Sequence, residues 1–184
     1  KDPLYRDINA NYAYAPQQKI AIIEMAAASG LDLLSNEERN PLKTTSFGTG
    51  QLINHALDQG TAGLENEIRV WKQFKSVFYF GTFDSPKQHD TIPVIEKNGI
   101  KMAMLSYTYG TNDIPREKPY QINYFDKAQI KKDIASAKEK SDAVIVSAHW
   151  GNEGKTKPNE TQQQYSKVFA DAGADVVLGT HPHV

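Results

Sequence analysis

The sequence predicts a mixed α/β fold, in which mixed sheets are flanked by helices. Residues 143–147 (AVIVS) and 174–178 (ADVVL) are nearly continuous apolar runs, which is typical of buried parallel strands. A helical pattern at residues 161–172 lies between them, as in a strand–helix–strand unit. Residues 92–107 contain the dipeptide Asn98-Gly99 between two apolar stretches, which predicts a β-hairpin and therefore a mixed sheet.

Capping and turn signals divide the rest of the chain. Upstream, we expect an irregular lead-in at 1–18, a strand or helix at 19–28, a short strand at 31–34, a loop at 35–43 and a helix at 47–57. Downstream, we expect a helix at 62–75 capped by Thr61, a strand at 76–80, a loop at 110–120, and a helix from its N-cap Asp126 to about residue 140.

Composition limits the classes of function. The 184 residues suffice for one domain, and we expect residues 1–184 to form a single, incomplete domain. A formal net charge of -1 indicates no basic surface for nucleic acid. Cysteine is absent, which excludes disulfides and thiolate metal sites. No run of about 18 apolar residues and no signal peptide is present, so we expect no membrane segment in this chain.

Three histidines follow the two predicted parallel strands. His149 lies just after residues 143–147, and His181 and His183 follow residues 174–178. The carboxyl ends of parallel strands meet at one edge of a sheet, so the three imidazoles should converge. Pro182 should hold its two neighbours in an extended stretch. The pattern favours a metal site over three hydrogen-bonded histidines, whereas His89, in a polar loop, is expected to be an ordinary surface or core residue.

Several motifs in the same order resemble one family. The runs VIVSAHWGNE and AGADVVLGTHPHV, the segment VIEKNGIKMAMLSYTYGTN, and residues 54–64 (NHALDQGTAGL) are similar to CapA-type capsule (poly-γ-glutamate) biosynthesis proteins, a branch of the calcineurin-like metallophosphoesterase superfamily. The resemblance covers residues 54–184. It implies a partial α/β/β/α sandwich around two divalent metal ions (Mn, Fe, Zn or Mg).

The resemblance also implies roles for individual residues. Asn54, His149 and His181 would bind the second metal ion, and His183 the first. His55 would stand near the leaving group as an acid or electrostatic stabiliser. The two ions together would activate a water for attack on phosphorus.

The chain departs from the family pattern near its start. The family's Gly-Asp and Asn-x-Glu motifs, which supply the remaining carboxylates, are not visible. We therefore expect a metal-dependent phosphoesterase in the full-length parent and an inactive chain here. The parent would be extracytoplasmic and membrane-anchored, with other capsule-synthesis membrane proteins as partners and the anchor outside this chain. The main alternative is a non-catalytic structural component of a capsule-synthesis complex.

Residues 20–53 do not fit the capsule pattern. Their EMAAASGL and RNPLKTTSFGTG runs resemble bacterial glycerate kinase, so we expect an inserted or swapped segment, of natural or engineered origin. A glycerate kinase-related fragment or an engineered chimera is a further alternative. The SFGTG turn is either a helix cap or an anion-binding turn. In the kinase pattern Asn54 lies inside the helix at 47–57. Because helix propensity there is good, we expect Asn54 to be helical and displaced from His149.

Overall fold

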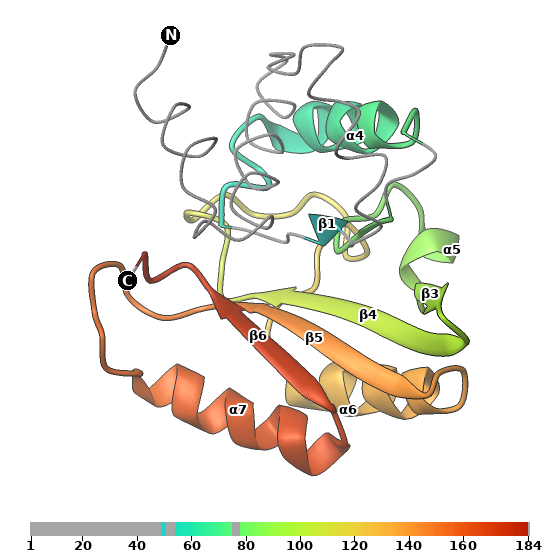
Figure 1. Ribbon diagram of the computed structural model, residues 1–184. Helices are drawn as coiled ribbons and strands as arrows, with labels where there is room; N and C mark the ends of the chain where they lie inside the picture. The colour runs from blue at the N-terminus through green and yellow to red at the C-terminus, as the bar shows by residue number, and fades with distance from the viewer. Residues whose placement is uncertain (1–48, 51–53, 75–77, 184) are drawn as a thin grey trace, which may run out of the picture.

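A four-stranded mixed sheet lies at the centre of the molecule. The computed structural model describes residues 49–50, 54–74 and 78–183, and the expectations for residues 1–48 fall outside this part of the chain. The sheet order is β3-β4-β5-β6 (Figure 1). Its strands are β3 (Val94–Lys97), β4 (Ile100–Thr108), β5 (Ala143–His149) and β6 (Val176–Thr180).

The pairing of the strands confirms the mixed α/β prediction. Strands β3 and β4 form the expected antiparallel hairpin, and β4, β5 and β6 are parallel. Asn98 and Gly99 join the hairpin with φ of 54° and 80°. Positive φ at both central residues is the conformation that tight hairpins favour and that this dipeptide tolerates.

Two helices cover one face of the sheet (Figure 1). They are α6 (Lys127–Lys138) and α7 (Glu160–Ala172). Asp126 caps α6 as expected, and a capping box of Asn159 and Gln162 starts α7. The core beneath the sheet contains fully buried residues from both layers: Ala103, Tyr107, Ile130, Ile134, Val146, Ala148 and Phe169.

The opposite face carries smaller elements. These are β1 (Thr49–Gly50), parallel to β2 (Tyr79–Phe80), with α4 (Gly60–Trp71) above them and α5 (Pro86–His89) at the side (Figure 1). Leu57, Leu64, Ile68 and Ile122 form a second buried cluster there. No helix in the described residues is long and apolar enough to cross a membrane.

The helix expected at 47–57 is wrong for the residues of this segment that the structure describes. Thr49 and Gly50 form strand β1, and residues 54–59 form turns before α4 begins at Gly60. Buried contacts explain the difference, because Ala56 and Leu57 pack in the second cluster and Asn54 binds the main sheet. Tertiary contacts of this kind override local helix propensity, which is a weak preference.

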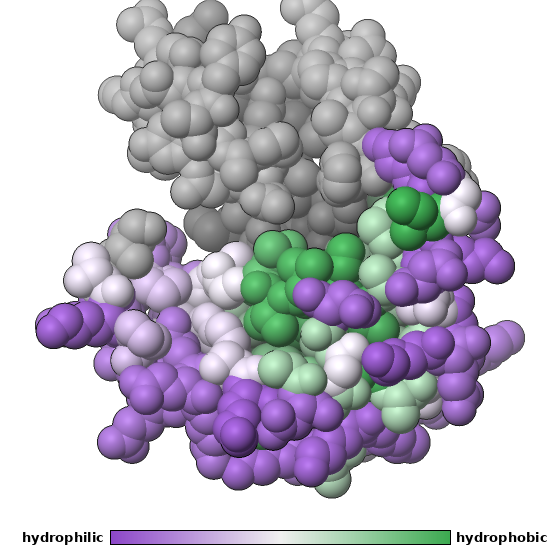
Figure 2. Space-filling model, turned by 60° about the horizontal axis from the view of Figure 1, so that its bottom comes forward, coloured by the Kyte–Doolittle hydropathy of each residue, from purple (hydrophilic) through white to green (hydrophobic). Residues whose placement is uncertain are grey.

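Cover on this upper face is incomplete among the described residues. Val176 and Leu178 on β6 are 42% and 41% exposed, so the burial expected of this apolar strand is not met on its upper face. Figure 2, in which the bottom of Figure 1 is turned forward, shows hydrophobic surface gathered in one area and framed by hydrophilic side chains.

Candidate metal centre

The carboxyl ends of three parallel strands meet at one edge of the sheet. In the strand register, His149 of β5 lies beside Thr108 of β4 and Thr180 of β6. His149 is 6% exposed, and its Nδ1 lies 3.0 Å from the Thr180 hydroxyl. Its Nε2 lies 2.9 Å from Oδ1 of Asn54. A carbonyl oxygen only accepts, so Nε2–H donates to Asn54 and Nδ1 accepts from Thr180.

His181 and His183 come to this edge on a bent loop. The His149 and His181 rings are 4.7 Å apart between centroids, and the His181 and His183 rings 6.1 Å. The predicted convergence of the three histidines is confirmed. The extended stretch around Pro182 is wrong, because His181 and His183 have φ of 98° and 56°. Left-handed backbone at bulky residues is strained and concentrates at functional sites.

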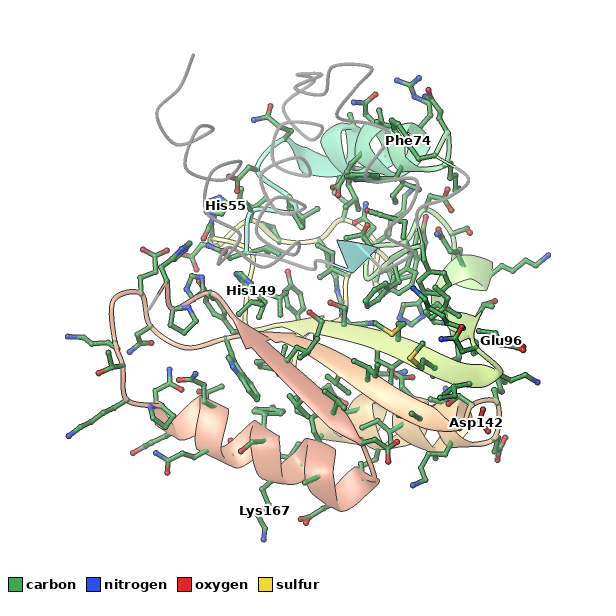
Figure 3. The ribbon with its side chains drawn as sticks, in the orientation of Figure 1. His55, Phe74, Glu96, Asp142, His149 and Lys167 are labelled. Carbon is green, nitrogen blue, oxygen red and sulfur yellow. The ribbon has the colours of Figure 1, made fainter. Side chains whose placement is uncertain are left out.

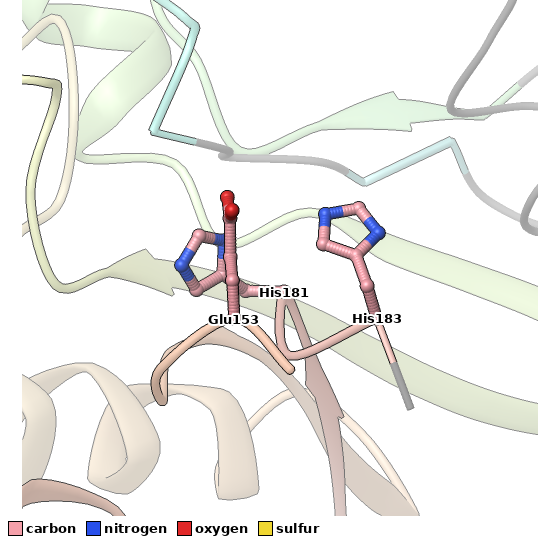
Figure 4. A group of neighbouring side chains, drawn as sticks. All are labelled: Glu153, His181 and His183. Atoms are coloured by element: carbon pink, nitrogen blue, oxygen red, sulfur yellow. The ribbon is translucent and has the colours of Figure 1, made fainter. Parts of the chain in front are cut away.

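A carboxylate that the sequence did not single out completes this cluster. Ligand atoms of Glu153, His181 and His183 all lie within 4.8 Å of one another, and the three side chains point to the same side of their loops (Figure 4). Two imidazoles and a carboxylate form a ligand set that suits zinc and related divalent ions. Glu153 lies in the run HWGNE, but no clear signal in the sequence predicts the bend that turns its side chain toward the histidines.

Backbone contacts hold Glu153 in this position. Gly154 N–H donates to the Pro182 carbonyl oxygen at 2.7 Å, and Trp150 N–H donates to the Thr180 carbonyl oxygen at 3.1 Å. Gly151 has φ of 98°, and a Cβ there would lie 2.9 Å from Pro182. Glycine therefore allows the loop after β5 to turn sharply against the loop after β6.

Asn54 lies at the cluster, contrary to the expectation that it is helical and displaced. It is 5% exposed, and its side chain bonds His149 as described above. Its amide nitrogen donates to Asn112 Oδ1 at 2.8 Å. The turn at residues 54–59 frees the Asn54 side chain from the helix geometry that would have directed it elsewhere.

His55 follows Asn54 in the chain and lies above His149 in the view of Figure 3. Its Nδ1 is 2.6 Å from Asp58 Oδ2 and 3.0 Å from the Asn112 amide nitrogen. Its side chain is 49% exposed. His55 is thus close to the cluster through its neighbour and accessible from solvent.

Electrostatics keep the buried histidine neutral. Burial, followed by the nearby His181, His183 and His55, lowers the pKa of His149 to about 3. Burial also lowers the pKa of His181, although Glu153 opposes this shift. Neutral imidazole is the form that binds metal, so the site is prepared for a cation without loss of a proton from these rings.

A hollow adjoins the cluster. Its volume is about 570 Å³, and Tyr109, the segment 110–115 and Tyr124 line it. Tyr109 stacks on His149, with ring centroids 6.2 Å apart, and lies 5.0 Å from the His181 ring. Tyr109 therefore forms a wall between the hollow and the histidines.

His89 has the ordinary role expected of it. It lies on α5, where its Nε2 is 3.0 Å from Asn123 Oδ1 and its Nδ1 is 2.9 Å from Asp90. Both ring nitrogens have protein partners, and none of them belongs to the cluster of Glu153, His181 and His183.

Comparison with known proteins finds two families in the chain. The profile of the family described as bacterial capsule synthesis protein PGA_cap matches residues 53–184. That of the glycerate kinase family matches residues 1–65, a longer stretch than the 20–53 expected. The two matches overlap only at residues 53–65, which is consistent with a chimera.

Individual relatives agree with this division. The chain is 32% identical over 167 residues to the capsule biosynthesis protein CapA of Bacillus anthracis, covering 86% of this chain and 40% of that protein. It is 29% identical over 133 residues to the PGA biosynthesis protein CapA of Bacillus subtilis (strain 168), covering 71% and 35%. A glycerate kinase of Halalkalibacterium halodurans is 53% identical over 58 residues, 32% of this chain and 15% of that enzyme.

The chain spans less than half the length of the CapA proteins that it matches. The capsule profile nevertheless covers well over half of the chain, including every histidine described here. This chain belongs to the bacterial capsule synthesis protein family, PGA_cap.

Proposed function

We propose that this chain carries the divalent-metal centre of a CapA-like protein of capsule polymer biosynthesis, whose full-length parent acts as a metal-dependent phosphoesterase. The observation that carries the proposal is the grouping of Glu153, His181 and His183 within 4.8 Å at the carboxyl edge of the parallel strands. In this group Glu153 offers the chain an anionic ligand of its own, although the family's upstream carboxylate motifs are not visible.

A second pair of ligands supports the proposal. Octahedral ions such as Mg²⁺ bind oxygen at about 2.1 Å, so two ligand atoms at right angles lie about 3 Å apart. Asn54 Oδ1 and His149 Nε2 are separated by 2.9 Å. For a cation to bind both atoms, the proton on His149 Nε2 would move to Nδ1, which would then donate to the Thr180 hydroxyl. Mn, Fe, Zn and Mg all suit this mixture of imidazole, amide and carboxylate.

The remaining residues have roles around such a centre. A bound divalent ion would polarise a phosphoryl oxygen and lower the pKa of a water. His55, oriented by Asp58, is exposed enough to meet a leaving group as its acid or electrostatic stabiliser. Tyr109 and the hollow beside it offer a surface for the organic part of the ester.

The names of the relatives support an inference about the cellular setting of the parent. One CapA protein is described by capsule biosynthesis and the other by PGA biosynthesis. We infer that the parent is extracytoplasmic and membrane-anchored, and that its partners are other capsule-synthesis membrane proteins. We further infer that residues 1–184 are a single, incomplete domain in which residues 20–53 are a glycerate kinase-like replacement.

Metal titration tests the proposal on the chain itself. Calorimetric titration of the metal-free protein with MnCl₂ and ZnCl₂ should give saturable binding. Glu153→Gln should weaken it by about tenfold or more, since even outer-sphere partners of a metal contribute that much. Glu139→Gln, an exposed carboxylate at the C-cap of α6 and the opposite end of the sheet, is the matched control. Absence of saturable binding, or equal weakening by both variants, would refute the metal centre.

A hydrolysis assay then separates the enzyme from a structural component. The full-length parent should hydrolyse bis(4-nitrophenyl) phosphate with Mn²⁺, and His55→Ala should lower the rate more than the metal affinity. A parent that binds metal tightly but hydrolyses neither this diester nor a monoester would instead support the non-catalytic role in a capsule-synthesis complex.

A further inference from the structure

Asn112 connects two hydrogen-bonded pairs of the candidate centre, Asn54 with His149 and His55 with Asp58. It lies in the loop after β4, far in sequence from both pairs. Its Oδ1 accepts from the Asn54 amide at 2.8 Å. Its Nδ2 donates to Asp58 Oδ1 at 3.3 Å and lies 3.0 Å from His55 Nδ1. The expected roles for Asn54 and His55 did not include this residue.

The Asp58 carboxylate determines which groups donate and which accept in this series of hydrogen bonds. The Asp58 carboxylate only accepts, so the nitrogen of Asn112 must face it. The Asn112 oxygen then faces Asn54, and the Asn54 nitrogen must point to it. What remains is the Asn54 oxygen, which is directed at His149 Nε2 at 2.9 Å. If the Asn112 amide were turned by 180°, its nitrogen would face the nitrogen of Asn54. Two donors would then face each other at Asn54, which is 5% exposed.

The loop that carries Asn112 is built to hold it. Asn112 and Asp113 have φ of 52° and 60°, a conformation that Asn and Asp tolerate better than other non-glycine residues. Thr111, 4% exposed, anchors the turn through its hydroxyl, which donates to the Ile114 carbonyl oxygen at 2.6 Å and lies 2.7 Å from Tyr124 Oη. Ile114 N–H donates back to the Thr111 carbonyl oxygen at 2.9 Å.

We propose that Asn112 is a positioning residue. The Asp58 carboxylate fixes the orientation of the Asn112 amide, and Asn112 in turn fixes the orientation of the Asn54 amide, so that the Asn54 oxygen faces His149 and the metal ion. The significance for catalysis rests on the proposed metal centre, whereas the amide orientation itself does not. Asn112 also keeps the Asn54–His149 pair and the His55–Asp58 pair in one hydrogen-bonded unit. Metal ligand and acid are thereby held at a constant separation.

Side-chain amide NMR of the metal-free protein tests the orientation directly. In the wild type, the Asn54 NH₂ signals should be resolved and protected from exchange with water. Asn112→Ala removes the acceptor, so these signals should lose protection and move toward free-amide shifts. The Asn123 amide, which donates to the Ser106 carbonyl oxygen, is an internal control and should not change. Unchanged Asn54 signals in Asn112→Ala would overturn the proposal.

An exchange of two side chains distinguishes positioning from packing. In the double variant Asn112→Asp with Asp58→Asn, the new carboxylate still accepts from Asn54 and the new amide donates to it. Protection of the Asn54 signals should therefore be restored, and Mn²⁺ affinity should return to within about threefold of wild type. Asn112→Ala should cost about tenfold or more in Mn²⁺ affinity. Equal losses of Mn²⁺ affinity in Asn112→Ala and in the double variant would overturn the positioning role of Asn112.

Two further comparisons keep the interpretation separate from the metal proposal. Asp113→Asn changes charge at the neighbouring left-handed position and should leave the Asn54 signals unchanged; their loss in this variant would contradict a specific role of Asn112. If the wild type binds no metal, the proposed function fails while the NMR comparison still decides whether Asn112 orients Asn54.

Discussion

Acid should unfold this protein through His149 before its carboxylates are fully protonated. His149 is 6% exposed and both of its ring nitrogens are hydrogen-bonded. Its pKa falls from 6.5 to about 3 in the folded protein, because burial and the neighbouring His181, His183 and His55 oppose a second proton. Between these two pKa values, His149 therefore binds a proton in the unfolded chain but not in the folded chain. The stabilisation is complete above about pH 6.5 and is lost as the pH falls toward 3.

The size of the effect follows from the width of that window. Each pH unit between the two pKa values costs about 1.4 kcal/mol of unfolding free energy. At pH 4.5, about two units below the unfolded pKa, the loss attributable to His149 is about 3 kcal/mol. A loss of this size is a large fraction of the stability of an ordinary domain.

Urea unfolding of the metal-free protein at pH 8, 6.5, 5.5 and 4.5 measures this loss against His149→Gln. Glutamine keeps an amide donor near Asn54 but does not titrate. The variant should be less stable than the wild type at pH 8, and the difference should shrink by about 3 kcal/mol at pH 4.5. A difference independent of pH would refute the interpretation of His149 as a buried neutral imidazole.

Substitutions at three other residues test separate parts of the structure. Burial raises the pKa of Glu67 to about 7, although a hydrogen bond from Tyr79 opposes this; Glu67→Gln should therefore stabilise the protein by about 3 kcal/mol at pH 8 and by little at pH 4.5, as measured by urea unfolding. Gly179→Ala places a Cβ 2.6 Å from Trp150 Nε1 and should cost about 1–3 kcal/mol, visible as a lower Tm. Tyr109→Ala should raise KM for a diester in the full-length parent more than it lowers metal affinity, while Tyr109→Phe keeps both, because only the ring lies against the histidines.

Local signals predicted the elements whose geometry depends on neighbours in sequence. Asn98-Gly99 specified a two-residue hairpin, and Asp126 an N-cap, because both act within a few residues. The apolar runs of β5 and β6 predicted parallel strands and thereby the convergence of His149 with His181. Strand topology alone determines that edge, so no knowledge of the loops was needed.

Loops and long-range contacts account for what the sequence did not reveal. Glu153 reaches the histidines only because Gly151 bends the chain and Gly154 N–H binds the Pro182 carbonyl oxygen. Neither contact leaves a periodic pattern. Asn112 is equally hidden, since its partners lie more than fifty positions away. The metal roles themselves stay predictions, because geometry brings the ligands together without testing them.

The region around Asn54 shows how the two family patterns are reconciled. Residues up to 65 match the glycerate kinase profile, yet Asn54 lies in a turn and not in the helix expected from that pattern. Helix propensity at residues 51–57 is worth a few tenths of a kcal/mol per residue. Burial of Leu57 alone contributes about 2 kcal/mol, and the paired amides of Asn54 and Asn112 avoid a further desolvation cost of about 1–3 kcal/mol. The contacts with the sheet outweigh the helix preference, so the segment follows the fold that it joins and the candidate site keeps its asparagine.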